Sequence, residues 1–332
     1  MKCFWVWFFR TWCAWLGAAA TVTAAETAIT RQDAPSVLVL VGAPGEVEFS
    51  TNFTYQAQLW ERAAKRGGAT LSTIGVGETN RTEDQSLFRQ MLDVEPKEGL
   101  AELWIILIGH GTFDGREARF NLRGPDVTAT ELADWLKPFR RPLVLVNTAS
   151  ASAPFLNKLS GTNRIIAVST RSGFEQNYAR FGKYLAESIS DPEGDLDQDG
   201  QTSLLEAFLR ASHRVEEFYK NEGRLATEHP LIDDNGDGQG TPADWFRGTR
   251  ATRKSKEGSA VDGLRARQRH LIPSVEEMAM KPEVRAQRDA LELKIEALRL
   301  EKASMQESVY FDRLEQLLLE IARLKRGSSG FE

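Results

Sequence analysis

Five aliphatic runs, each closed by glycine or by small polar residues, constrain the fold of this chain more than any other feature. They read SVLVLVGA at 36–43, ATLSTIGVG at 69–77, ELWIILIGHG at 102–111, RPLVLVNTAS at 141–150 and RIIAVSTRSG at 164–173. Segments with helical spacing of apolar residues or with capping signals lie between them, as at 54–67, 82–94 and 128–139. Buried strands that alternate with helices form βαβ units. The sequence therefore predicts an α/β fold, a mainly parallel sheet flanked by helices, over residues 33–190.

The carboxyl ends of the predicted parallel strands are where functional groups are expected to gather. His110 stands at such an end between Gly109 and Gly111, and small polar residues follow the next strand at 147–152. Neither a GxGxxG nor a Walker A motif occurs, so a nucleotide site is not indicated. The formal net charge of -5 also argues against general nucleic-acid binding.

The N-terminal stretch has the pattern of a secretion signal. Lys2 and Arg10 flank an aromatic run, an apolar core ending in small residues follows, and cleavage after Ala24 or Ala25 fits the small-residue rule. The alternative is an uncleaved membrane anchor, although the uncharged stretch after Arg10 is about 15 residues, short of the roughly 20 that span a bilayer. We therefore expect residues 1–24 to be a signal peptide and the protein to be secreted or periplasmic, with membrane contact only through an uncleaved signal.

Cysteine is confined to this predicted signal. Cys3 and Cys13 are the only two cysteines of the 332-residue chain. A mature chain without them has no disulfide, no thiolate metal site and no cysteine nucleophile. Any catalysis or metal binding must then rely on other side chains.

A strand ending in His-Gly, followed after a helix by a strand ending in small residues, resembles the caspase–legumain family. The resemblance covers about residues 36–190. It implies a peptidase scaffold in which the third strand delivers a histidine and the fourth a cysteine. His110 matches the family histidine, while the cysteine position falls on Ala149 or, with a slip of one residue, on Ser150. The segment STRSGFEQNYARFG after the fifth strand resembles the one that borders the family's substrate pocket.

The missing thiolate leads to two hypotheses of different classes. The first is a pseudopeptidase, a caspase/legumain-like scaffold whose pocket binds a peptide or protein partner without cutting it. The alternative is a hydrolase in which Ser150 or Ser152 attacks, His110 is the base and Asp114 orients it, although no GxSxG motif surrounds these serines. His110 could also be a polar residue retained at a strand end because its glycine neighbours leave room.

Residues 195–206, DLDQDGQTSLLE, match the EF-hand calcium loop at its ligand positions. Positions 1, 3, 5, 7, 9 and 12 are filled by Asp195, Asp197, Asp199, Gln201, Ser203 and Glu206. Gly200 takes position 6, where the loop turns sharply, and Gln201 is expected to contribute its backbone carbonyl. Candidate helices at 177–189 and 203–223 flank the loop. The sequence therefore predicts Ca²⁺ binding here rather than a solvated Asp/Gly turn.

A second, weaker copy of the pattern lies at 233–244, DDNGDGQGTPAD. Its candidate ligands are Asp233, Asn235, Asp237 and, in the closing place where aspartate is shorter than glutamate, Asp244. No regular helix precedes this copy, so calcium binding and a structural Asx turn remain open alternatives. The stretch TEHPLIDDNGDGQGTPADWF also resembles a segment of secreted bacterial proteins of the caspase-like type. The two loops together define an EF-hand-like region at 178–246.

The remaining chain is predicted to be a linker followed by a helical segment. Residues 247–273 begin with the basic run RGTRATRKSKEG and are expected to be a solvated linker. Residues 284–326 lack glycine and proline and carry an apolar stripe with helical spacing, within a helical segment at 274–326. A coiled coil, a hairpin turning near 304–308 and a helix laid on the main domain all fit this stripe, which also allows self-association.

Overall fold

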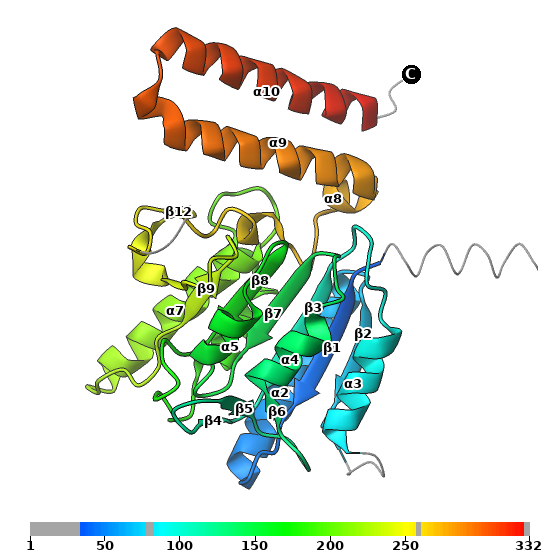
Figure 1. Ribbon diagram of the computed structural model, residues 1–332, viewed down its shortest axis with the longest axis vertical. Coiled ribbons are helices and arrows are strands. Elements are labelled where there is room, and N and C mark those ends of the chain that lie inside the picture. Colours follow the sequence, from blue (N-terminus) through cyan, green and yellow to red (C-terminus); the bar gives the residue numbers. More distant parts are fainter. Residues whose placement is uncertain (1–33, 78–82, 257–259, 329–332) are drawn as a thin grey trace, which may run out of the picture.

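A seven-stranded sheet forms the centre of the computed structural model, which describes residues 34–77, 83–256 and 260–328. In spatial order the strands are β10 (Thr241–Pro242), β9 (Leu231–Asp233), β8 (Arg164–Val168), β7 (Leu143–Asn147), β3 (Leu103–Ile108), β1 (Ser36–Val41) and β2 (Thr70–Ile74). The strands from β8 to β2 are parallel, and β9 and β10 add an antiparallel edge. The predicted α/β fold with a mainly parallel sheet is confirmed (Figure 1). The predicted signal at 1–24 lies outside the described residues.

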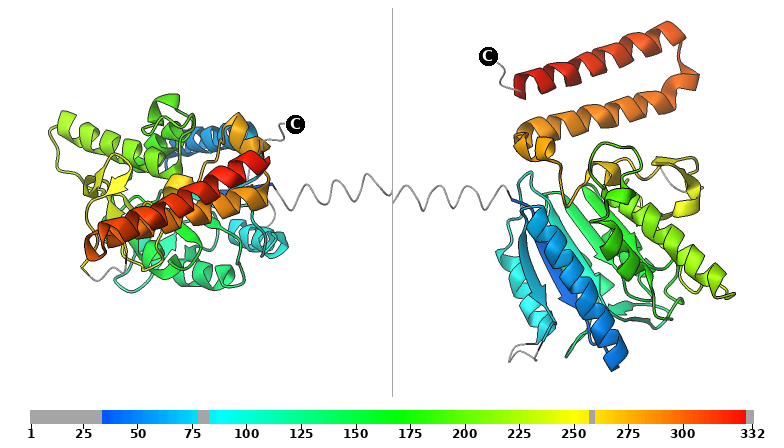
Figure 2. Two further views of the ribbon diagram at one scale, coloured as in Figure 1. Left: turned by 90° about the horizontal axis from the view of Figure 1, so that it is seen from above. Right: turned by 180° about the vertical axis from the view of Figure 1, so that it is seen from behind.

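Helices cover both faces of the sheet (Figures 1 and 2). One face carries α2 (Val47–Arg66), α6 (Phe181–Ser188) and α7 (Leu204–Asn221). The other face carries α3 (Asp84–Val94), α4 (Ala129–Leu136) and α5 (Ala153–Leu159).

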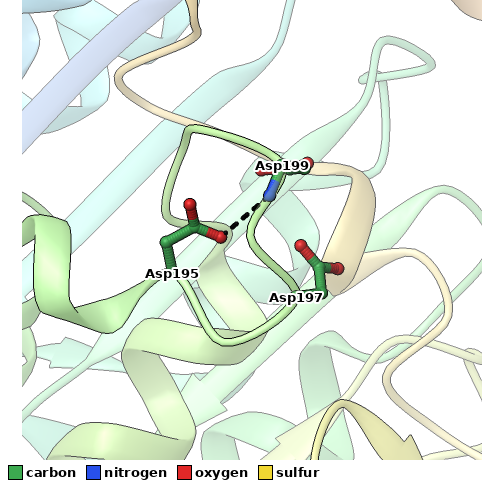
Figure 3. A group of neighbouring side chains, drawn as sticks. All are labelled: Asp195, Asp197 and Asp199. Atoms are coloured by element: carbon green, nitrogen blue, oxygen red, sulfur yellow. Dashed lines mark hydrogen bonds between the residues drawn. The ribbon is translucent and has the colours of Figure 1, made fainter.

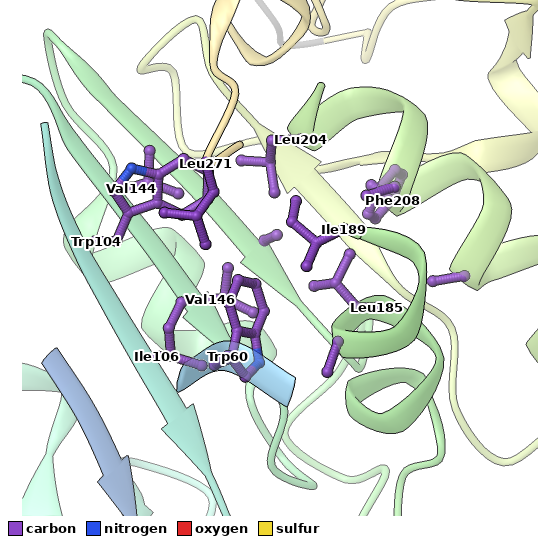
Figure 4. Close-up of a cluster of buried hydrophobic side chains, with 14 of the residues drawn as sticks. Trp60, Trp104, Ile106, Val144, Val146, Leu185, Ile189, Leu204, Phe208 and Leu271 are labelled. Carbon is purple, nitrogen blue, oxygen red and sulfur yellow. The ribbon is translucent and has the colours of Figure 1, made fainter. Parts of the chain in front are cut away.

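Two apolar cores, one on each face, hold these layers together. Val144 and Val146 of β7 share a core with Trp60 of α2 and Phe208 of α7, as Figure 4 shows. Leu145, on the same strand, belongs to the other core. Successive strand side chains point to opposite faces, so a strand buried on both sides must be apolar throughout. This is why the aliphatic runs could be read as central strands.

Short elements fill the connections. Strands β4 (Gly111–Phe113), β5 (Ala118–Phe120) and β6 (Val127–Thr128) form a small sheet, and β11 (Phe246–Arg247) pairs with β12 (Arg250–Ala251). Single-turn helices are η1 (Pro192–Gly194), η2 (Ala243–Trp245), η3 (Ala266–Gln268) and η4 (Lys302–Ser304). The small sheet begins one residue after His110 and therefore sets the backbone around that side chain.

Residues 260–273, the second half of the predicted linker, pack into the main domain instead. Ala266 and Leu271 are buried in the core that contains α2 and α7. The arginines between them are accommodated because they reach carboxylates, as Arg267 does with Glu296 and Arg269 with Asp289. The basic composition of the segment suggested a solvated chain, and the apolar residues spaced between its charges explain the difference.

The C-terminal segment is a helical hairpin. After the short α8 (Val275–Ala279), α9 (Pro282–Glu301) runs antiparallel to α10 (Glu307–Ser328), with the turn at η4. Figures 1 and 2 show α9 lying over the main domain and α10 on the far side of α9. Of the three predicted arrangements the structure thus shows the hairpin. Among the described residues no helix has the length and apolar character needed to cross a membrane.

Candidate functional site

His110 lies two residues after the end of β3 and packs among aromatic rings. Its ring centroid is 4.7 Å from that of Phe49, 5.1 Å from that of Phe53 and 6.3 Å from that of Tyr178. The ring Nε2 lies 3.3 Å from the Pro44 carbonyl oxygen. Burial lowers the pKa of His110 below that of a free imidazole. The ring contacts aromatic side chains and a backbone carbonyl.

Ser150 does not pair with this histidine. Its Oγ donates to the Gly111 carbonyl at 3.0 Å and accepts from the Gly111 N–H at 3.2 Å. The residue is 4% exposed, which leaves little room for a substrate carbonyl beside the hydroxyl. The sequence places Ser150 next to the family's nucleophile position, but the hydroxyl instead joins the turn after β7 to the start of β4.

Ser152 and Asp114 also have other partners than the hydrolase hypothesis requires. Ser152 is fully buried, where its Oγ lies 3.2 Å from Thr170 Oγ1 and accepts the Ser169 N–H at 3.1 Å. Asp114 forms an ion pair with Arg119 at 2.8 Å instead of orienting His110. The Glu117 N–H and the Arg119 guanidinium hold the pKa of Asp114 well below its usual range. The proposed serine–histidine–aspartate arrangement is not assembled.

The turn between β7 and α5 contains a strained residue that the sequence did not reveal. Ala151 has a φ of +52°, in the left-handed region that a residue with a Cβ rarely adopts. Its N–H donates to the Glu175 carbonyl at 2.8 Å. The Glu175 side chain lies 2.6 Å from His229 Nδ1. The segment that resembles the border of the family pocket therefore supports this turn through its backbone.

A second missed residue is Glu228, whose carboxylate is buried at the start of α6. It accepts hydrogen bonds from the Arg180 N–H at 2.8 Å, the Phe181 N–H at 2.9 Å and the Tyr219 hydroxyl at 3.2 Å. Burial raises the pKa of Glu228. The Glu228 carboxylate takes the place of a local N-cap of α6. Because Glu228 is 47 positions from Phe181, no local sequence pattern predicts this contact.

The loop at 195–206 gathers three carboxylates. Oxygen atoms of Asp195, Asp197 and Asp199 all lie within 4.8 Å of one another, and Figure 3 shows the three side chains on one loop. Asp195 accepts the Asp199 N–H at 3.1 Å and the Gly200 N–H at 2.9 Å. Gly200 has a φ of +88°, which its lack of a Cβ permits. These contacts coil the loop so that its carboxylates converge.

Glu206 closes this loop from the first turn of α7. One of its oxygens accepts the N–H groups of Leu196 at 2.8 Å and Asp197 at 3.2 Å. The other accepts the Ser203 N–H at 2.8 Å, while the Ser203 hydroxyl accepts the Glu206 N–H at 3.2 Å. This capping box begins α7 and leaves Glu206 only 1% exposed.

The charges of the loop suit a hard cation. Partial burial and the nearby carboxylates of Glu206 and Asp199 raise the pKa of Asp197 to about 6. Every candidate ligand is an oxygen, the donor type that Ca²⁺ and Mg²⁺ take in proteins. The Gln201 side chain has another role, since its Oε1 accepts the Ser274 N–H at 2.9 Å and joins the loop to the start of α8. Its backbone carbonyl remains the candidate ligand.

The elements around the loop differ in part from the predicted helix–loop–helix. The exiting helix forms as expected, but α6 ends at Ser188, seven positions before Asp195. The single turn η1 occupies the intervening stretch, and the Asp191 carboxylate caps it by accepting the Glu193 N–H. A short 3-10 turn therefore enters the loop where an EF-hand has a long helix.

The second candidate loop is a β-hairpin connection between β9 and β10. Asp233 accepts the N–H groups of Gly236 and Gly238, each at 3.0 Å, and Asn235 accepts the Asp237 N–H at 2.8 Å. Asp244 lies apart on η2 and is exposed. In the described part of the chain, the group of three acidic side chains close enough to share an ion is the one at 195–199. The geometry favours the Asx-turn alternative for Asp233, Asn235 and Asp237.

Two buried aspartates fasten this hairpin to the segment after it. Asp234 accepts the N–H groups of Gly263, Arg265 and Ala266. Asp262 accepts hydrogen bonds from the N–H groups of Asp234 and Asn235 and from the Thr241 hydroxyl. Burial and the neighbouring charge of Asp234 raise the pKa of Asp262 to about 8. We call these two residues the aspartate pair.

Solved structures match part of this chain at low similarity. No family model and no curated protein sequence matches the chain. Among solved structures, the initiator caspase Dronc from Drosophila has 14% sequence identity and a TM-score of 0.43, covering 63% of this chain and 83% of its own. Caspase-1 from Spodoptera frugiperda has 10% identity and a TM-score of 0.39, covering 61% of this chain and 87% of its own.

A protein from Geobacter sulfurreducens also matches. It has 10% identity and a TM-score of 0.37, and the match covers 60% of this chain and 92% of that protein. At such identities and TM-scores these similarities assign no residue role to this chain. Two groups of its own side chains carry the chemistry: the aromatic rings around His110 and the oxygen-rich loop at 195–206.

Proposed function

We propose that this protein binds Ca²⁺ through the loop at 195–206. The observation that carries the proposal is the convergence of the Asp195, Asp197 and Asp199 carboxylates within 4.8 Å of one another. Like charges gathered in this way repel unless a cation lies between them. The spacing of the ligands and the left-handed glycine in the sixth position both agree with a calcium loop.

In this proposal each ligand has a defined part. Three aspartates supply side-chain oxygens, Gln201 its backbone carbonyl, and Ser203 the ninth position, where a bridging water often lies. Glu206 supplies the closing carboxylate from α7. The ion would draw together the turn η1 and the start of α7, so its main effect would be to stabilise the fold.

The proposed location of the protein agrees with such a site. A secreted or periplasmic chain whose cysteines lie in its signal cannot be stabilised by disulfides, and calcium can take over that role. Extracellular calcium modules bind with dissociation constants of about 0.1–1 mM, which the surrounding calcium is sufficient to occupy. We expect this loop to belong to that class.

The pocket around His110 supports a binding role rather than peptide cleavage. The family's cysteine position falls on Ala149 or, with a slip of one residue, on Ser150, and Ala149, which is 1% exposed, cannot attack a carbonyl. The hydroxyl of Ser150 is engaged by Gly111, and His110 stacks among aromatic rings. The scaffold therefore resembles a peptidase without its nucleophile, and a peptide or protein partner is the class of ligand we propose for it.

Calorimetry of the purified protein tests the calcium proposal directly. We expect Ca²⁺ binding with a dissociation constant of about 1 mM or lower. Asp199→Asn should weaken binding because it removes one carboxylate from the exposed side of the loop. Asp237→Asn, in the second loop, should leave the affinity unchanged. An absence of binding at millimolar calcium would contradict the proposal, and a loss caused only by Asp237→Asn would move the site to the second loop.

Peptide libraries and a serine-reactive fluorophosphonate test the pocket. We expect neither cleavage nor labelling, with or without calcium. Cleavage that disappears in both His110→Ala and Ser150→Ala would restore the hydrolase hypothesis. The two tests are independent, because calcium binding and the chemistry of the pocket involve different residues.

A further inference from the structure

The outer helix of the C-terminal hairpin carries two apolar rows, and one of them is uncovered. The row formed by Tyr310, Leu314, Leu317, Ile321 and Leu324 is buried or half-buried. The uncovered row lies on the neighbouring flank, where Phe311 is 49% and Leu318 51% exposed, and the half-buried Ala322 continues it one turn further. We call Phe311, Leu318 and Ala322 the α10 flank.

The spacing of the α10 flank is that of a helix-pairing surface. Its members follow at intervals of seven and four residues, so they line one side of the helix. Leu319, beside the flank, is 43% exposed. In Figures 1 and 2, α9 separates α10 from the sheet domain, so the outer side of α10 is open to another molecule.

The charge distribution along α10 identifies the partner. The stretch 307–320 holds four acidic residues (Glu307, Asp312, Glu315 and Glu320) and a single basic one, Arg313. The stretch 321–326 holds Arg323, Lys325 and Arg326 and no acidic residue. A helix with an acidic first part and a basic end complements itself when two copies lie antiparallel, and it repels itself when they lie parallel.

We propose that α10 pairs antiparallel with α10 of a second copy of this chain, with Leu318 near the twofold axis. Leu318 then meets its own copy. Asp312 comes within about one turn of Arg323 and Arg326 of the other copy, because positions equally far before and after the axis face each other. An isologous contact of this kind uses one patch twice and closes as a dimer. Apolar contact along the flank provides affinity, and the charges set the direction.

Charge reversal tests this direction in the full chain. One variant carries Asp312→Arg and Glu315→Arg, which gives both parts of α10 a net positive charge. The other carries Arg323→Glu and Arg326→Glu, which gives both parts a net negative charge. We expect wild type to dimerise in sedimentation experiments, each variant alone to dimerise at least about tenfold more weakly, and an equimolar mixture of the two to recover the dimer.

Cysteine cross-linking locates the axis. In a background with Cys3→Ser and Cys13→Ser, Leu318→Cys should form a disulfide-linked dimer under mild oxidation. Phe311→Cys should not, because its two copies would be about 20 Å apart along the helices. Circular dichroism checks that all variants keep their helices. A monomeric wild type, variants that dimerise normally, or cross-linking through position 311 instead of 318 would overturn the proposal.

Discussion

Glu206 is predicted to have two separable roles, and Glu206→Gln distinguishes them. Without calcium, its carboxylate accepts the N–H groups of Leu196, Asp197 and Ser203 in a site that is 1% exposed. A glutamine keeps one oxygen and turns an NH₂ group toward the remaining donors. Leaving a buried N–H unsatisfied costs about 1–3 kcal/mol, and the lost charge at the start of α7 adds about 0.3–1 kcal/mol. We expect the unfolding free energy in EDTA to fall by about 2–3 kcal/mol.

With calcium the difference between the two proteins should grow. A ligand at a hundredfold excess over its dissociation constant stabilises the native state by about 2.7 kcal/mol, and the variant should lose most of this. Urea unfolding followed by tryptophan fluorescence measures both conditions, because Trp60 and Trp104 are buried in the core. Thr128→Ala is the matched control: it removes the equivalent capping hydroxyl from α4, costs about 1 kcal/mol in either condition and lies outside the calcium loop. If the Glu206→Gln deficit is the same with and without calcium, the glutamate is only a helix cap.

Three further predictions follow from buried groups and from the packing of the C-terminal segment. Because the pKa of Asp262 is raised to about 8, the folded chain holds a proton there that the unfolded chain releases near pH 4, so stability should fall as pH rises from about 4 to 8. Asp262→Asn should flatten this fall in urea titrations at pH 5, 7 and 9, and an equal slope in both proteins would contradict the assignment. Glu228→Ala should cost about 3 kcal/mol, since three donors at α6 and Tyr219 lose their acceptor, whereas Glu228→Gln should cost less. A chain ending at residue 280 should unfold cooperatively, while one ending at residue 256 should be strongly destabilised because Ala266 and Leu271 leave the core; equal stability of the two would show that these residues contribute little.

The central strands could be predicted from the sequence because the residues within each strand are enough to identify it. Runs such as 103–108 are apolar at every position, which only a strand buried on both faces requires. The strands β9 and β10 were not predicted because they are only three and two residues long and contain no aliphatic run. The capping box at Thr128 is likewise local, and α4 begins where this pattern predicts.

The site was less predictable because its decisive contacts join distant residues. Ser150 and Gly111 are 39 positions apart, so nothing near Ser150 shows that its hydroxyl is already occupied. The second loop was ambiguous for another reason, since Asp and Asn at alternate positions suit both calcium ligation and Asx turns. The structure separates them, because Asp244 lies apart on η2 and, among the described residues, the group of three converging carboxylates is the one at 195–199.

The aspartate pair has a consequence for how this protein can vary. Its two carboxylates join the hairpin after β9 to the turn that starts at residue 262. These hydrogen bonds hold together the two ends of the chain segment 236–261, which therefore forms a closed loop. The entropy of closing such a loop rises only slowly with its length, by about 0.6 kcal/mol for each doubling. Extra residues inserted beyond β12 would therefore leave the sheet domain almost as stable as before. This loop is a place where a new binding segment could be grafted onto the scaffold without a disulfide to anchor it.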